Sequence, residues 1–392
     1  MAIAKALEAS IQGSSLIRAM FEEGERRKIA LGPDKVFDFS LGNPVFEPPL
    51  AVVEALKTLT QSEQPGTHRY MPNAGYKETR DYIASLMADE SGLAFLVGDI
   101  CMCVGAGGAL NVILKCLLDP GDEVIVIRPY FVEYDYYFKN HGGQAVPVLS
   151  GPGFQIDLAA IEAAIGPKTK AVLINSPNNP TGVIYDQKAL EALGGLLTKK
   201  SAELGRVITL ISDEPYRALV YDEVKPPCVF NSYNNVILAT SSSKDLALPG
   251  ERIGYLAISP LHQDRALLGQ AAPLALRTLG FVNAPALMQR LLPMVKGAKV
   301  DIEPYRINRD LLYNHLTSLG LDCVKPQGAF YLFPKCPIAD DLLFCEKAQA
   351  LNLLVVPGRA FGLAGYFRIA YCFQTEMIRR SLPVFTELIK GL

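Results

Sequence analysis

Residues 236–258 read V-I-L-A-T-S-S-S-K-D-L-A-L-P-G-E-R-I-G-Y-L-A-I, and the rest of the chain is organised around this stretch. The β-branched apolar run at 236–240 predicts a buried strand, and a second apolar run at 253–258 predicts that the sheet resumes. Between the runs lie three serines, Lys244 and, eight residues later, Arg252. A lysine between two buried strands is badly placed for a solubilising charge, so this polar segment is a candidate site.

The chemistry of the segment fits one kind of cofactor. Burial disfavours the ammonium form of a lysine and lowers its pKa, which gives an amine that attacks a carbonyl near neutral pH. Hydroxyl groups and a bidentate arginine beside that amine suit a phosphate. An amine that forms a Schiff base next to a phosphate site is what pyridoxal phosphate requires. The alternative is that Lys244 lies in a polar loop with its charge in solvent, as most lysines do.

Length and composition define the class of protein. A chain of 392 residues can form two domains with ample core. A hydrophobic content of 49% and a mean hydropathy of +0.18 exclude a disordered protein. The net charge of −2 gives no case for nucleic acid or an anionic membrane as a partner. The sequence has no apolar run of about 18 residues and no signal-peptide core near Met1, so we expect no membrane span.

The cysteines and histidines give no sign of a metal site. Of the eight cysteines only Cys101 and Cys103 are close in sequence, there are four histidines, and no paired C-x-x-C with zinc spacing occurs. Reduced, mostly buried thiols in a cytoplasmic protein are the preferred interpretation.

Strand and helix patterns alternate up to about Leu261, and polar residues collect where the predicted strands end. Such segments lie at 105–109, 128–134, 175–182, 212–216 and 241–244. In open, mostly parallel α/β sheets this edge is where ligands bind. The alternation therefore predicts an α/β fold with a site at the carboxyl edge of the sheet. Beyond Leu261 the pattern loosens into an α+β-like run.

Several single residues have two interpretations at this level. Asp213 directly follows an apolar strand and either needs a buried partner or caps the next turn. Arg368 lies mid-strand and needs either an anionic ligand or a structural ion pair. Gly42 either permits close approach of a ligand or is a plain turn glycine. Tyr70 is either a surface aromatic or reaches over to a site, and its loop favours the former.

Four motifs occur in order along the chain: N-N-P-T-G at 178–182, S-D-E-P-Y at 212–216, S-x-S-K at 241–244 with Arg252 beyond it, and F-R-I-A at 367–370. Together they resemble the class I/II aminotransferases, the fold-type-I pyridoxal phosphate enzymes, over essentially the whole chain. The resemblance implies an α/β fold with a mostly parallel sheet and helices on both faces, plus a smaller α+β domain built from both chain ends. It suggests three segments: a helical arm and part of the small domain at 1–48, a large cofactor domain at 49–282, and a small C-terminal domain at 283–392.

The resemblance also implies roles for the residues around the cofactor ring. Lys244 would form the Schiff base and then act as the base for the 1,3-proton shift. Asp213 would keep the pyridine nitrogen protonated, so that the ring accepts electrons. Asn179 and Tyr216 would hydrogen-bond the ring phenolate. Phe131 matches the ring-stacking position, with Tyr130 as its nearest competitor. Asn179-Pro180 is a candidate cis peptide bond.

Further roles concern the phosphate and the substrate. The phosphate-binding residues implied by the resemblance are Ala106, Gly107, Gly108, Ser241, Ser243 and Arg252. Tyr70 matches a tyrosine that reaches the phosphate of the neighbouring subunit, which implies a homodimer with shared active sites. Arg368 would clamp the substrate α-carboxylate, with Gly42 and Asn179 beside it.

The resemblance predicts a transaminase of amino-acid metabolism that transfers an amino group from an L-amino acid to a 2-oxo acid such as 2-oxoglutarate. Aspartate, or an acidic or broad set of donors, is the first choice. Some aspartate-specific relatives have a lysine where this chain has Gly107. Arg277 is a weak candidate anchor for a distal carboxylate, because its spacing to Asn283-Ala284-Pro285 is off by one residue. The alternatives are a β-lyase on the same scaffold and a ligand-sensing regulator, although no basic helix-turn-helix extension is present.

Overall fold

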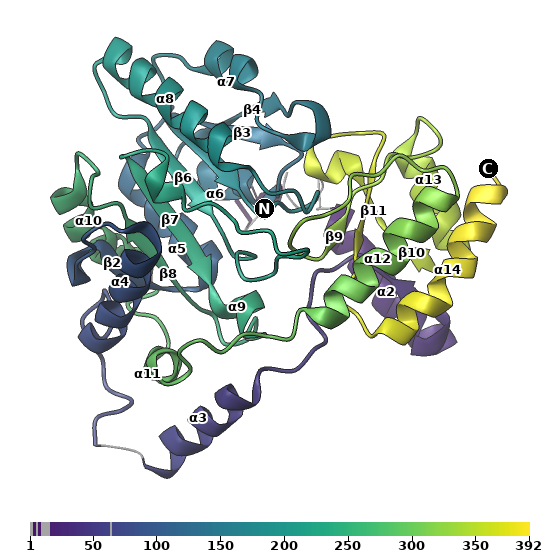
Figure 1. Ribbon diagram of the computed structural model, residues 1–392, viewed down its shortest axis with the longest axis horizontal. Helices are drawn as coiled ribbons and strands as arrows, with labels where there is room; N and C mark the ends of the chain where they lie inside the picture. The colour runs from purple at the N-terminus through teal and green to yellow at the C-terminus, as the bar shows by residue number, and fades with distance from the viewer. Residues whose placement is uncertain (1–2, 5–6, 9–15, 63–64) are drawn as a thin grey trace.

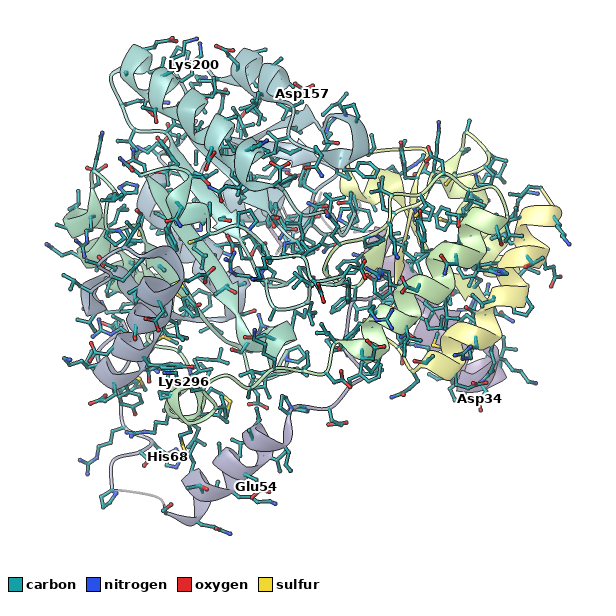
Figure 2. The ribbon with its side chains drawn as sticks, viewed as in Figure 1. Asp34, Glu54, His68, Asp157, Lys200 and Lys296 are labelled. Carbon is teal, nitrogen blue, oxygen red and sulfur yellow. The ribbon has the colours of Figure 1, made fainter. Side chains whose placement is uncertain are left out.

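The computed structural model describes residues 3–4, 7–8, 16–62 and 65–392. Figure 1 shows a large body on the left, built on a twisted sheet, and a smaller body on the right that contains both the N-terminal helix α2 and the C-terminal helix α14. Charged side chains such as Glu54 and Lys296 lie at the outer rim (Figure 2). Among the described residues no helix is long and apolar enough to cross a membrane.

A seven-stranded sheet, in the order β2-β8-β7-β6-β5-β3-β4, forms the centre of the large body. Neighbouring strands from β4 to β7 run parallel, and β8 is antiparallel to both β2 and β7. The strands are β2 Ile100–Val104, β3 Glu123–Arg128, β4 Gln144–Leu149, β5 Thr169–Asn175, β6 Thr209–Asp213, β7 Val236–Ser241 and β8 Ile253–Ile258. The predicted mostly parallel α/β sheet is confirmed, and the strand pair predicted around Lys244 is β7 and β8.

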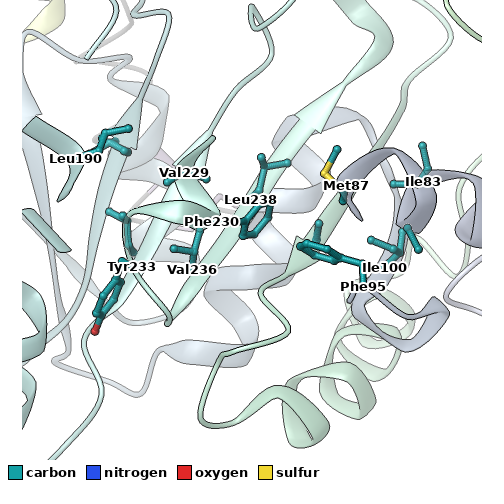
Figure 3. Close-up of a cluster of buried hydrophobic side chains, with 14 of the residues drawn as sticks. Ile83, Met87, Phe95, Ile100, Leu190, Val229, Phe230, Tyr233, Val236 and Leu238 are labelled. Atoms are coloured by element: carbon teal, nitrogen blue, oxygen red, sulfur yellow. The ribbon is translucent and has the colours of Figure 1, made fainter. Parts of the chain in front are cut away.

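Helices cover both faces of this sheet because its strands are apolar on both sides. In β5, Val172 and Ile174 face one core cluster while Ala171 and Leu173 face another, as the two-residue period of a strand requires. The first cluster packs against α3, α4, α8 and α11, and part of it is drawn in Figure 3. The second packs against α5, α6 and α10. The helices of this body are α3 Leu50–Gln61, α4 Lys77–Ser91, α5 Gly105–Leu117, α6 Glu133–Asn140, α7 Leu158–Ala164, α8 Gln187–Leu204, α9 Ser242–Asp245, α10 Arg265–Thr278 and α11 Ala286–Met294.

The smaller body joins both chain ends, as the resemblance implied. A strand from the first part of the chain, β1, pairs in parallel with β10, and β11-β12-β9 form an antiparallel sheet. The strands are β1 Phe37–Asp38, β9 Tyr331–Leu332, β10 Leu353–Leu354, β11 Val356–Pro357 and β12 Phe367–Ala370, and the helices are α2 Leu16–Leu31, α12 Glu303–Ser318, α13 Asp341–Ala350 and α14 Thr375–Lys390. Short 3₁₀ turns lie at η1 Pro33–Lys35, η2 Val97–Asp99, η3 Pro152–Phe154, η4 Val229–Asn231 and η5 Gly358–Phe361.

The division at 48/49 and 282/283 stays a proposal, and the packing favours moving its second boundary. Helix α11 buries Met288 and Leu291 in the core of the large sheet, whereas Val300 belongs to the core of the small body. We therefore propose a boundary between Val295 and Val300. Of the predicted helical arm, residues 1–2, 5–6 and 9–15, with Ile11 among them, lie outside the described residues, and α2 accounts for its C-terminal part.

Arg309 in α12 is a fully buried arginine that ties the small body to the loop after β6. Its two terminal nitrogens donate to the Asp222 carboxylate at 2.8 Å each, and Nη1 also donates to the Pro326 carbonyl at 3.1 Å. We expect Arg309→Ala to lower the free energy of unfolding by about 3–5 kcal/mol, through lost packing and lost charge-assisted hydrogen bonds. Chemical denaturation measures this.

Arg306→Ala on the same helix is the matched control. Arg306 is partly exposed and pairs with Glu303 and Asp310 at the surface, so its loss should leave the denaturation curve unchanged. Equal effects of the two substitutions would contradict the assignment of Arg309 as a buried structural tie.

Candidate active site

A cavity of about 300 Å³ lies at the carboxyl edge of the large sheet and is closed on one side by the small body. Strand ends and their following turns supply most of its walls, while Tyr331 and Arg368 come from β9 and β12. The predicted site residues that line it are Gly42, Ala106, Gly107, Phe131, Asn179, Asp213, Tyr216, Ser241, Ser243, Lys244, Arg252 and Arg368. The polar strand ends expected to converge do converge.

Lys244 lies in the short helix α9, directly after β7. Its Nζ donates to the Gly42 carbonyl at 2.9 Å and lies 5.3 Å from the centre of the Phe330 ring. The pKa of the Lys244 ammonium is lowered from 10.5 to about 8, mainly because the group is buried. Cys372 opposes this shift, and the nearby charges of Arg252 and Arg368 contribute to it. The side chain is therefore a partly buried amine with a depressed pKa, and the solvent-loop alternative is wrong.

This pKa predicts how the protein would react with pyridoxal phosphate, the cofactor that the resemblance implies. Only the neutral amine attacks a carbonyl, so the rate of covalent capture should rise about tenfold per pH unit below the Lys244 pKa and level off above it. The plateau should begin near pH 8, where the pKa of Lys244 lies. Stopped-flow absorbance of capture against pH tests this. A rate that still rises as far as the ordinary lysine value of 10.5 would contradict it.

Asp213 ends β6 and is 5% exposed. Burial raises the pKa of this carboxyl to about 7, although a hydrogen bond from the Tyr134 hydroxyl lowers it. Tyr134 donates to Oδ2, and Asn175 Nδ2 donates to the Asp213 backbone carbonyl at 2.8 Å. Within the part of the chain that the structure describes, the buried Oδ1 accepts no hydrogen bond. The buried partner that the sequence predicted for Asp213 is therefore Tyr134, and Oδ1 stays available to a ligand.

One end of the cavity suits a phosphate. Helix α5 starts at Gly105, whose φ of +68° and close approach to the Arg252 guanidinium exclude a side chain there. The α5 N-terminus thus presents Ala106 and Gly107 beside Arg252, and Ser241 Oγ donates to Ser243 Oγ at 3.1 Å. Gly108 lies in the same turn but is buried and outside the cavity lining.

The opposite end holds a buried cation. Arg368 is 2% exposed, donates to Asn179 Oδ1 at 3.1 Å and to the Ser40 carbonyl, and its guanidinium lies 4.7 Å from the ring centres of both Tyr331 and Phe361. Burial lowers the pKa of Arg368. Among the described residues the groups that interact electrostatically with Arg368 are Tyr331, Tyr216 and Cys372 and include no carboxylate, and its Nε makes no hydrogen bond. The structural ion pair left open by the sequence is not found here, so this charge calls for an anionic ligand.

The other predicted residues differ in how the structure places them. Phe131 lines the cavity, whereas its competitor Tyr130 turns its hydroxyl to Asp135. Tyr70 is 89% exposed and outside the cavity, so its role toward a neighbouring subunit stays a prediction. Arg277 is exposed at the end of α10 and also lies outside the lining. The predicted cis peptide bond Asn179-Pro180 is confirmed.

Sequence reasoning did not single out Tyr134, Tyr137, Asn175 and Tyr331, all of which line the cavity. Tyr134 and Asn175 fall within the strand-end segments identified above, so the signal was their position. Tyr331 carried no such signal, because its hydroxyl meets that of Tyr216, at 2.9 Å, only through the docking of the two bodies.

The residues present fit pyridoxal phosphate. The cavity joins an amine with a depressed pKa, a free buried carboxylate oxygen and a glycine-rich helix N-terminus with an arginine. These groups match the aldehyde, the ring nitrogen and the phosphate of that cofactor. The fold and this donor set define a pyridoxal-phosphate enzyme whose cavity also holds the buried cation Arg368.

Comparison with known proteins identifies the family. The model of "Aminotransferase class I and II" matches residues 34–384, and the chain belongs to this family. The family depends on pyridoxal phosphate, so the chain is a pyridoxal-phosphate-dependent aminotransferase.

Curated relatives and solved structures agree with this. The chain is 34% identical over 359 residues to an aspartate/prephenate aminotransferase of Thermus thermophilus, covering 89% of each chain. It is 31% identical to an aspartate aminotransferase of Thermotoga maritima, covering 99% of this chain and 97% of that one. An aminotransferase structure from Eubacterium rectale superposes with a TM-score of 0.96 at 41% identity and covers 100% of this chain and 99% of that one.

Proposed function

We propose that this aminotransferase transfers the α-amino group of aspartate, or of a set of donors that includes acidic amino acids, to 2-oxoglutarate. The observation that carries this is the buried Arg368, which has no carboxylate partner in the described part of the chain and lines the same cavity as Lys244 and Asp213. The names of the relatives from Thermus and Thermotoga support aspartate as a donor.

We assign the following roles to the residues. Pyridoxal phosphate supplies a carbonyl for the amine and a ring that accepts electrons from the substrate α-carbon. Lys244 Nζ would hold the cofactor and, once released, would carry the proton that leaves the α-carbon. Arg368 and Asn179 bind and orient the substrate α-carboxylate. Asp213 would hydrogen-bond the ring nitrogen through Oδ1, and Phe131, which lines the cavity, would stack on the ring.

An acidic side chain needs a further cation. The cations that line the described part of the cavity are Lys244, Arg252 and Arg368, and each is assigned to the cofactor or the α-carboxylate. We propose that a second subunit supplies the remaining groups, with Tyr70 reaching its neighbour's phosphate and Arg277 as the candidate distal anchor. We also propose a cytoplasmic location for this homodimer, which fits the eight cysteines, all of them free.

The visible spectrum of purified holoenzyme tests the proposal as single amino acids are added without an oxo acid. With aspartate the band of the bound cofactor should disappear, and 2-oxoglutarate should restore it. Alanine and phenylalanine, added in the same way, define the breadth of the donor set. A band that persists with every donor, or the release of pyruvate without an acceptor, would contradict transamination as the main activity.

A further inference from the structure

Tyr134 forms part of the cavity wall beside Asp213. Tyr134 is 1% exposed and is enclosed by aromatic rings on its own helix and the preceding turn: its ring centre lies 6.4 Å from those of Tyr130 and Phe138 and 5.6 Å from that of Phe131. A buried tyrosine hydroxyl requires a hydrogen-bond partner. In this enclosure the hydroxyl donates to Asp213 Oδ2, 79 residues away in the sequence.

This contact makes the two carboxylate oxygens of Asp213 unequal. Oδ2 receives the Tyr134 hydroxyl and lies 3.5 Å from Asn175 Nδ2, while the buried Oδ1 has no partner among the described residues. The Tyr134 hydroxyl and, at longer range, Asn175 Nδ2 therefore restrain rotation of the carboxylate through Oδ2. Its remaining hydrogen-bonding capacity is therefore directed through a single oxygen.

The hydrogen bond also favours the charged form of the carboxylate. Burial alone raises the pKa of Asp213, and the hydroxyl of Tyr134 opposes this by stabilising the anion. Removing the hydroxyl would leave Oδ2 with only the long 3.5 Å contact from Asn175 Nδ2, and a buried carboxyl with so little hydrogen bonding favours its neutral form.

We infer that Tyr134 is a positioning residue that fixes Asp213 so that Oδ1, as part of an anion, binds the ring nitrogen of the cofactor. The inference rests on the proposed role of Asp213 toward that nitrogen. The inference assigns a role to the Tyr134 hydroxyl beyond core packing. Phe138, one turn further on α6, packs in the same core without a hydroxyl.

The test compares two cofactors on the apoenzyme: pyridoxal phosphate, and its analogue with carbon in place of the ring nitrogen. Wild type should bind the natural cofactor more tightly than the analogue. Tyr134→Phe should weaken natural cofactor binding about tenfold, as expected for loss of a hydrogen bond to a charged group, and leave the analogue unchanged. Fluorescence titration gives both affinities without turnover.

Tyr136→Phe is the matched control: it removes the same group from the same helix, outside the cavity lining, and should change neither affinity. Equal weakening of both cofactors by Tyr134→Phe, or of neither, would overturn the inference. A wild type that does not distinguish the cofactors would instead overturn the role of Asp213. If Tyr134→Phe does not fold, the hydroxyl is removed in an Asp213→Asn background. There the substitution should change neither affinity, and a loss would overturn the inference.

Discussion

Lys244→Ala is expected to lower kcat by roughly 10⁴-fold or more, because in the proposed mechanism one side chain would provide both the covalent attachment and the proton transfer. The partly buried amine, with a pKa of about 8, donates to the Gly42 carbonyl and lines the same cavity as Arg252 and Arg368. Alanine removes the amine without enlarging any side chain. Single-turnover kinetics with aspartate and the visible spectrum of the purified protein measure the loss.

The matched control is Lys200→Ala. Lys200 lies on α8 and pairs with Glu162 and Glu203 at the surface, so its removal should leave kcat and the spectrum unchanged. A Lys244→Ala protein that keeps the wild-type cofactor band would exclude Lys244 as the attachment site. Added methylamine, which supplies a free amine, should restore part of the lost proton transfer.

Arg368→Lys should lower kcat/KM for amino acids by about 100- to 1,000-fold, which is the range for losing one partner of a buried, hydrogen-bonded charge pair. Lysine retains the charge but not the planar fork that donates to Asn179 and the Ser40 carbonyl and stacks between Tyr331 and Phe361. The loss should appear mainly in KM, because the α-carboxylate is bound both in the ground state and in the transition state.

An amine without a carboxylate distinguishes binding from general damage. Wild type and Arg368→Lys should react equally slowly with such an amine, because it has no carboxylate for residue 368 to bind. Arg380→Lys, an exposed position on α14 near Asp34, should behave as wild type. If Arg368→Lys slowed the simple amine as much as it slowed aspartate, Arg368 would be a structural residue.

The residues with local signals were found from the sequence. Apolar runs bounded by polar turns determine the strands of the large sheet, because a buried strand needs a continuous apolar segment and a turn to end it. Lys244, Asp213, Asn179 and the glycine turn lie at such ends, and a parallel sheet brings these ends to one edge whatever the strand order.

The interaction partner of each site residue was decided only by the tertiary structure. The sequence left open whether Arg368 has a carboxylate partner, and the docking of β12 against the 175–182 turn, 189 residues away, gives it Asn179 instead. The pairing of Tyr134 with Asp213 and of Tyr331 with Tyr216 likewise joins residues 79 and 115 positions apart. Such contacts depend on strand order, on the antiparallel insertion of β8 and on how the small body packs against the large one. None of these leaves a periodic pattern in the chain, because they are set by packing between elements and not within one.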